Sequence, residues 1–172
     1  MTASLTDALC TRCGLCCDGS LFADVELAGQ VEADGLEILG LEIDDDDAGG
    51  ARLIQPCTAL RGRRCGIYAQ RPECCRTFEC RLLQEARRGD VSVERATKLI
   101  AETLERIARV EELLAELGDR RRRLPLKERC AEALALRPHA SAEVNRTRRE
   151  LEAAMAEVER RIRATFLGDS LS

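Results

Sequence analysis

The sequence has few aromatic residues and a single histidine. Three Phe, one Tyr and no Trp account for 2 % of its 172 residues, so the chain lacks an aromatic platform on which single-stranded nucleic acid could stack. The formal net charge of −4 also argues against general binding to nucleic acid or to anionic membranes. His139 stands beside Pro138, far along the chain from most of the cysteines, and we interpret it as a solvated surface residue. Thiol catalysis therefore has no candidate base.

The sequence also lacks long hydrophobic runs. It contains no apolar stretch of about 18 residues, the length expected of a transmembrane helix. Residues 1–9 contain no basic residue and no apolar segment of signal-peptide length. We therefore expect a cytoplasmic protein that does not contact a membrane. Because disulfides are rare in the cytosol, a cysteine cluster there indicates metal binding or catalysis rather than a disulfide scaffold.

Ten cysteines and an uneven distribution of charge divide the chain in two. Nine cysteines lie at or before Cys80, and only Cys130 follows. Residues 1–80 carry 7 Arg or Lys against 14 Asp or Glu, whereas residues 81–172 carry 20 against 17. We predict a cysteine-cluster metal-binding domain over residues 1–88 and a helical extension over residues 89–172. The expected fold class is mainly α, with a small irregular cysteine-rich domain that has few short strands.

Two long helices are expected in the extension. Apolar residues recur at spacings of 3 and 4 from Ile100 to Leu117, and a similar pattern runs from Val144 to Phe166; each pattern marks one face of a helix. A shorter helix is expected over 127–136, ended by Pro138. An antiparallel hairpin would cover both apolar faces, and the alternative is a protein partner or self-association through the extension. The expected capping residues are Ser92 and Gly118 for the first long helix, and Ser141 and Gly168 for the second.

Charged residues of the extension suggest two surface features. Glu102 with Arg106, and Glu105 with Arg109, are spaced for ion pairs along the exposed side of the first long helix. The run Arg120–Arg123 is interpreted as a solvated helix end. A contact with phosphate or nucleic acid is the alternative for this run.

Local signals in the first half predict short elements. We expect a short helix and a strand within residues 21–41, and a strand over 52–55. The acidic segment 44–47 is interpreted as a solvated loop, because four consecutive Asp do not alternate as the ligands of a calcium loop do. Gly62 marks a turn. A single helix is expected from Pro72 through Ala86, since proline is tolerated in a first helical turn, and Arg87, Arg88 and Gly89 are expected to end it.

The first four cysteines, Cys10, Cys13, Cys16 and Cys17, lie within eight residues, and we expect them to form a tight loop. Zinc sites use paired Cys-x2-Cys hooks, whereas iron–sulfur clusters use a Cys-x2-Cys-x2-Cys run with one remote cysteine. With no histidine nearby, the site would consist of thiolates alone, which select zinc, iron–sulfur clusters or Cu(I). The remote cysteines available are Cys57, Cys65, Cys74, Cys75 and Cys80.

The residues around the later cysteines add a longer pattern. Gln55-Pro56-Cys57 is followed by Cys65-Gly-Ile-Tyr-x2-Arg-Pro-x2-Cys75-Arg-x-Phe-x-Cys80. Over roughly residues 8–85 the chain resembles the YkgJ-type cysteine-cluster family, whose CxxCxxCC domain is described as chelating zinc or iron. The resemblance implies eight ligands: Cys10, Cys13, Cys16, Cys17, Cys57, Cys65, Cys75 and Cys80.

Three kinds of residue around this pattern need an interpretation of their own. Cys74 stands where the family pattern asks for no cysteine, so the choice between Cys74 and Cys75 as ligand stays open. Cys130 lies outside the pattern and is expected to be a buried, apolar-like residue. We expect Arg71 and Arg76 to offset thiolate charge, and Phe78 to pack beside the cluster.

These features predict a cytosolic protein that binds an iron–sulfur cluster of the 4Fe-4S type or zinc through eight cysteines. The eight thiolates form either two four-cysteine sites or one cluster with a separate site. The Cys-x2-Cys-x2-Cys run slightly favours iron–sulfur, and with it a redox or cluster role. The alternatives are a zinc-stapled interaction module without catalytic activity, a metal chaperone or sensor, and a cluster-dependent enzyme distantly similar to the flagellin lysine-N-methylases.

Overall fold

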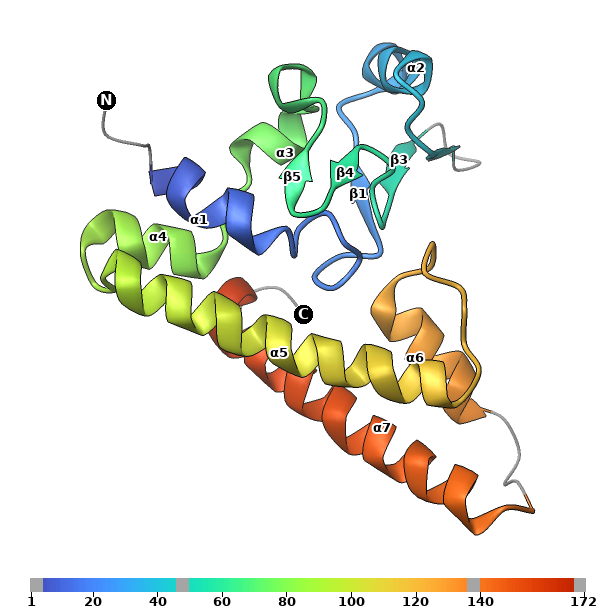
Figure 1. The fold of residues 1–172 in the computed structure, drawn as a ribbon. Helices are drawn as coiled ribbons and strands as arrows, with labels where there is room; N and C mark the ends of the chain where they lie inside the picture. Colours follow the sequence, from blue (N-terminus) through green and yellow to red (C-terminus); the bar gives the residue numbers. More distant parts are fainter. Residues whose placement is uncertain (1–4, 46–49, 136–139, 169–172) are drawn as a thin grey trace.

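The computed structural model describes residues 5–45, 50–135 and 140–168. Figure 1 shows the short elements of the first half lying along one side of a long helical hairpin. The described chain is mainly helical with few short strands, which confirms the predicted fold class. None of its described helices is both long and apolar enough to span a bilayer.

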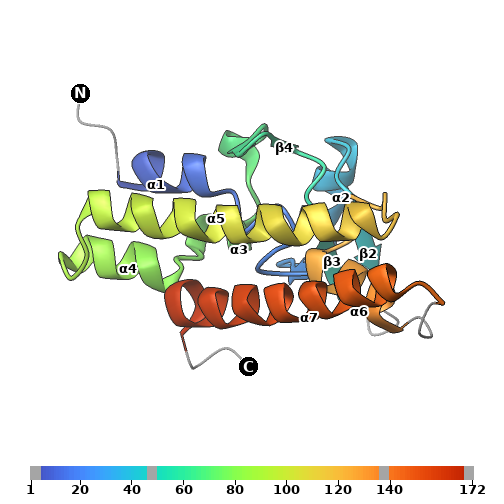
Figure 2. The same ribbon diagram turned by 60° about the horizontal axis from the view of Figure 1, so that its bottom comes forward.

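The hairpin consists of α5 (Val93–Glu116) and α7 (Ala142–Ile162), joined through the shorter α6 (Leu126–Ala135). The two long helices run antiparallel, side by side in both views (Figures 1 and 2). Ser92 Oγ accepts from Arg95 N at 3.2 Å, and Ser141 Oγ accepts from Val144 N at 3.5 Å, so both predicted N-caps are confirmed. The buried side chains of the two helices include Ile100, Ile107, Val110 and Leu114 of α5, and Leu151, Met155, Val158 and Ile162 of α7.

The two C-terminal boundaries also follow the prediction. Gly118, with φ +87°, follows α5, and Gly168, with φ +73°, follows a π-helical turn over Arg163–Leu167 that extends α7. Phe166 of that turn is buried. The predicted helix end at Pro138 and the interpretation of His139 lie outside the described residues.

Ion pairs join the two long helices to each other. Arg161 pairs with Glu102, and Arg106 Nε lies 3.5 Å from Glu157 Oε1. Arg109 pairs with Glu150 across the hairpin and with Glu112 on its own helix, both at 3.2 Å. These two arginines therefore use other carboxylates than the expected Glu102 and Glu105, and that prediction is wrong. The antiparallel neighbour offers them carboxylates that the sequence of α5 alone does not reveal.

The first half is built on two small sheets. Strand β3 (Ala51–Ile54) lies between β1 (Asp24–Glu26) and β2 (Ile43–Asp45), antiparallel to both. Helix α2 (Gln30–Ile38) packs on this sheet and was expected in this region. The second sheet is the hairpin of β4 (Leu60–Arg61) and β5 (Arg64–Cys65), which turns at Gly62 with φ +61°.

The single helix predicted over 72–86 is wrong, because the chain breaks into two helices there. A 3₁₀ turn (Tyr68–Gln70) leads into α3 (Glu73–Thr77), and α4 (Arg81–Arg88) begins after the break. Phe78 and Cys80 are both extended, with ψ 124° and 157°. The Phe78 ring packs edge-on against Phe22, with centroids 5.2 Å apart, and this contact favours the break over a continuous helix.

Two hydrophobic cores support these elements. The larger core joins the hairpin helices to α1 (Leu5–Cys13) and α4, through Leu9, Leu15, Leu82 and Leu83. The smaller core lies between α2 and the three-stranded sheet and includes Leu27, Leu36 and Leu53, with Cys57, Cys74 and Cys75 packed against it. The division into units 1–88 and 89–172 stays a prediction.

A buried arginine fastens α6 to α5. Only 4 % of the Arg129 side chain is exposed. Its guanidinium donates to both carboxylate oxygens of Glu111, at 2.5 and 2.8 Å, and to Asp119 Oδ2 at 2.7 Å. Asp119 is equally buried, at 4 %. Removing one member of such a group leaves the others charged and unpaired.

We therefore predict that Arg129→Ala lowers the free energy of unfolding by about 3 kcal/mol or more. The matched control is Arg123→Ala, at an exposed position nearby, which should change it by about 0.5 kcal/mol or less. Urea unfolding followed by circular dichroism measures both. Equal stability of the two variants would contradict the structural role of the Arg129 cluster.

Candidate metal centre

The first two cysteines lie on helix α1 and not in the expected loop. Leu9 and Cys13 of this helix are buried, and α1 packs against both α4 and α5. The apolar contacts of Leu9 and Cys13 favour a helix over a loop at residues 5–13. The three-residue spacing then places Cys10 and Cys13 on one side of α1, so the tight loop begins only after Cys13.

Gly14 ends α1 and turns the chain sharply. Its φ of +69° lies in the left-handed region, where glycine is favoured. A Cβ at this position would come within 3.2 Å of Arg63 Cδ. Cys17 N donates to Gly14 O at 3.0 Å, and the next residue after Gly14, Leu15, is fully buried in the larger core. The loop that carries Cys16 and Cys17 is therefore held at its start.

Cys80 joins the first three cysteines. It is the N-cap residue of α4, which packs against α1. Burial raises the pKa of Cys10 to about 11 and that of Cys13 to about 12, and the charge of a Cys80 thiolate adds to both shifts. Burial also raises the pKa of Cys16, with the charges of Cys13 and Cys80 next in size. Because a Cys80 charge acts on all three of these thiols, we define Cys10, Cys13, Cys16 and Cys80 as the first group.

Cys17 faces different neighbours from Cys16. Burial raises its pKa to about 12, and the next largest contributions come from Cys57 and Cys65. Cys57 N donates to Cys17 O at 2.8 Å, so the backbone fixes these two residues side by side. Burial likewise raises the pKa of Cys57, to which Cys65 contributes. The charges of Cys17 and Cys57 also act on Cys75 of α3, and we define Cys17, Cys57, Cys65 and Cys75 as the second group.

Cys74 and Cys75 form an adjacent pair of thiols on α3, with their sulfur atoms 4.0 Å apart. Their hydrogen bond raises the pKa of Cys75, as do burial and the charges of Cys74, Cys17 and Cys57. The same bond lowers the pKa of Cys74, for which Glu32 is the nearby charge outside the pair. Charges of the second group therefore act on Cys75, whereas Glu32 is the charge outside the pair that acts on Cys74.

Two side chains that the sequence did not single out support these loops. Arg63, in the β4–β5 turn, donates to Cys13 O at 3.0 Å and to Asp18 Oδ2 at 3.1 Å. Gln55 is almost fully buried, and its Oε1 accepts from Cys57 N at 2.9 Å. Gln55 belongs to the longer cysteine pattern described above, so the sequence offered a signal for it. No sequence signal indicates a role for Arg63, because one arginine in a basic turn has no characteristic spacing.

Arg71 lies close to both groups, as its expected role requires. Its guanidinium stacks over the Tyr68 ring, 3.8 Å from the centroid. It donates to Tyr68 O at 3.2 Å and to Cys75 O at 3.4 Å. Burial raises the pKa values of Cys10 and Cys17, and the Arg71 charge acts in the opposite direction on both.

The chemical type of the candidate ligands suits a soft metal. Both groups consist of thiols alone, which suits zinc or iron–sulfur clusters. The raised pKa values of Cys10, Cys13, Cys16 and Cys17 favour the protonated thiols at neutral pH, so a metal has to displace their protons. Among the described residues, no three Cys, His, Asp or Glu side chains converge closely enough to hold an ion without some rearrangement. Cys130 lies apart, buried in the larger core on α6, as expected.

Comparison with known proteins identifies the cysteine-rich part. Searches of curated proteins and of solved structures found no match. Residues 9–91 match the family model CxxCxxCC, described as "Putative zinc- or iron-chelating domain". This is the family that the cysteine pattern resembles. Residues 9–91 of the chain are therefore similar to a domain described as chelating zinc or iron.

Proposed function

We propose that the chain holds two separate four-thiolate metal centres. The first would use Cys10, Cys13, Cys16 and Cys80, and the second Cys17, Cys57, Cys65 and Cys75. The observation that supports this division is the different surroundings of two consecutive residues. The largest thiolate contributions at Cys16 come from Cys13 and Cys80, ahead of Cys17, whereas those at Cys17 come from Cys57 and Cys65.

Iron–sulfur clusters of the 4Fe-4S type are the metal centres that we favour. The first group combines a Cys-x2-Cys-x2-Cys run with one remote cysteine, which is the ligand pattern of such clusters. In two-cluster ferredoxins the cysteine that follows the run binds the other cluster, and Cys17 would do the same here. Bound clusters supply one-electron transfer, so we propose a redox or cluster role in the cytoplasm.

A zinc-stapled structural module is the second candidate. Cys10 and Cys80 pack against the larger core, and Cys57 and Cys75 pack against the smaller one. A closed zinc site with four thiolate ligands at either place would tie together elements that lie far apart in the sequence, and it would supply stability without chemistry. A partner would then bind elsewhere, for instance on the helical extension.

Purification without oxygen separates the two candidates. We predict a brown protein that contains iron and acid-labile sulfide in equal amounts, because cubane clusters hold one sulfide per iron. The measurements are metal analysis, sulfide analysis and the visible spectrum of the full chain. A colourless protein with stoichiometric zinc would contradict the iron–sulfur assignment and support the structural module.

Substitution of the two consecutive cysteines tests the division into groups. Cys16→Ser and Cys17→Ser should each remove about half of the bound metal, and Cys130→Ser should remove none, because Cys130 belongs to neither group. The double variant Cys16→Ser/Cys80→Ser should lose no more than Cys16→Ser, whereas Cys16→Ser/Cys17→Ser should lose all the metal. If Cys16→Ser/Cys80→Ser loses all of it, the division is wrong.

The adjacent thiols of α3 give a second test of the ligand set. Because the charges of Cys17 and Cys57 act on Cys75, we expect Cys75 to be the ligand, and Cys75→Ser should lower the metal content by about half. Cys74→Ser should retain the full content. Metal analysis of the two purified variants decides between them, and the opposite result would make Cys74 the ligand.

A further inference from the structure

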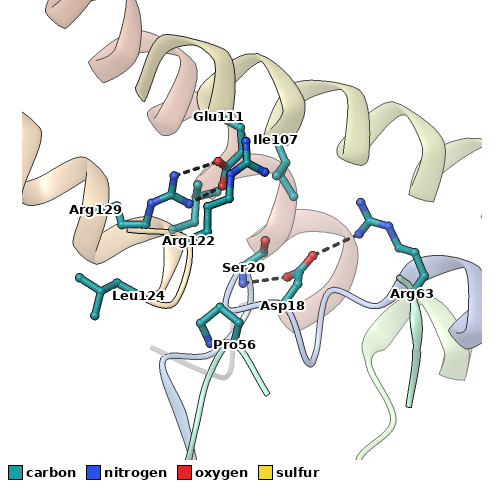
Figure 3. Close-up of a pocket in the computed structure, with 10 residues that line it drawn as sticks. Asp18, Ser20, Pro56, Arg63, Ile107, Glu111, Arg122, Leu124 and Arg129 are labelled. Carbon is teal, nitrogen blue, oxygen red and sulfur yellow. Dashed lines mark hydrogen bonds and ion pairs between the residues drawn. The ribbon is translucent and has the colours of Figure 1, made fainter. Parts of the chain in front are cut away.

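A cleft of about 240 Å³ lies between the cysteine loop and the hairpin (Figure 3). One side is formed by residues that follow Cys17, among them Asp18 and Ser20. The other side is formed by α5 and by the segment that leads into α6, including Ile107 and Leu124. No cysteine is among the described residues that line it, so the cleft is separate from the proposed metal centres.

Beside the cleft, the two parts of the chain approach closely at Gly19. Leu126 N donates to Gly19 O at 3.2 Å. A Cβ at Gly19 would come within 3.1 Å of Pro125 Cα and 3.2 Å of the Pro56 ring, and its φ of +77° also favours glycine. The close approach fixes the spacing between the loop and the start of α6, and the cleft opens beside it.

Four of the five charged side chains in the cleft are paired with one another. Asp18 pairs with Arg63 at 3.1 Å, and Glu111 holds Arg129 through two hydrogen bonds. Figure 3 shows both pairs as dashed lines, with Arg122 beside the second pair. Within the described chain, the Arg122 guanidinium makes no ion pair or hydrogen bond. Three arginines against two carboxylates leave the lining with one excess positive charge.

Neither carboxylate of the lining is available to Arg122. The Asp18 carboxylate accepts from Arg63 and from the Ser20 backbone N–H, the latter at 3.0 Å, and the Ser20 hydroxyl also interacts with it. Both oxygens of Glu111 accept from Arg129. Both carboxylates of the cleft are therefore already paired with other residues, so the excess positive charge of the cleft stays with Arg122.

Arg122 also differs from its neighbours in the arginine run. Arg121 pairs with Asp119 at 2.8 Å and with Glu132, so its charge is compensated. Arg122 and Arg123 are both exposed, but Arg123 does not line the cleft. Arg122 is therefore the member of this run whose uncompensated guanidinium borders a partly apolar cleft.

We propose that this cleft binds a small organic oxyanion, a carboxylate or a phosphate ester, whose charged group pairs with Arg122. A guanidinium presents parallel N–H groups that match the oxygens of either anion. Ile107 and Leu124 would contact the apolar part of the ligand. A cleft of this size suits a ligand smaller than a typical drug molecule.

Calorimetric titration of the metal-loaded full chain tests the proposal. The probes are succinate and inorganic phosphate, each at constant ionic strength, and their comparison distinguishes a carboxylate ligand from a phosphate ligand. We expect saturable binding of one probe, one per chain. Arg122→Gln should weaken it about tenfold or more, because a charge-assisted hydrogen bond is lost. The neighbouring control Arg123→Gln should leave the affinity within about twofold.

Two results would overturn the proposal. One is the failure of both probes to bind saturably. The other is an equal loss of affinity in Arg122→Gln and Arg123→Gln, which would show general attraction to the arginine run. Metal analysis of the same samples keeps this test apart from the two-centre proposal, since Arg122→Gln should retain all its metal.

Discussion

Cys16 and Cys17 are consecutive residues, and the arrangement of the cysteine-rich half depends on the conformation of the loop that carries them. In the proposed arrangement these consecutive residues belong to different groups of thiols, so their loop has to hold one conformation. The left-handed turn at Gly14 and the buried Leu15 fix its start. The hydrogen bond from Cys57 N to Cys17 O fixes its end. Arg63 bridges the helix before the loop and the Asp18 carboxylate after it.

The two groups of thiols rest on different supports. The first includes α1 and the start of α4, which pack with the long helices in the larger core. The second lies on loops, strand β5 and helix α3, next to the smaller core. In the account proposed here, metal in the second group stabilises the less regular part of the fold, whose own core is small. The hairpin then acts as the rigid base for both groups.

Features set by neighbouring residues in the sequence could be predicted, and those set by distant contacts could not. The caps at Ser92 and Ser141 and the apolar faces of α5 and α7 depend on local spacing, and they were found from it. The break before α4 depends on Phe78 meeting Phe22, which lies far away in the sequence. The cross-helix ion pairs of α5 depend in the same way on α7.

The same limit applies to the candidate site. The spacing of the cysteines indicated a metal-binding domain, and the family match confirms that much. The proposed grouping of the thiols could not be predicted, because it depends on the break that separates Cys75 on α3 from Cys80 at the start of α4. A continuous helix would have carried both thiols on one rigid element. The support from Arg63 and the meeting of Gly19 with Pro125 also come from the tertiary fold alone.

The central claim is that the chain holds two separate metal centres. Native mass spectrometry of the full chain, purified without oxygen and compared with the same sample after denaturation, tests it most directly. The account predicts an added mass that equals two identical centres, either two four-iron clusters or two zinc ions. An added mass of one centre per chain, with all eight cysteines intact, would contradict it.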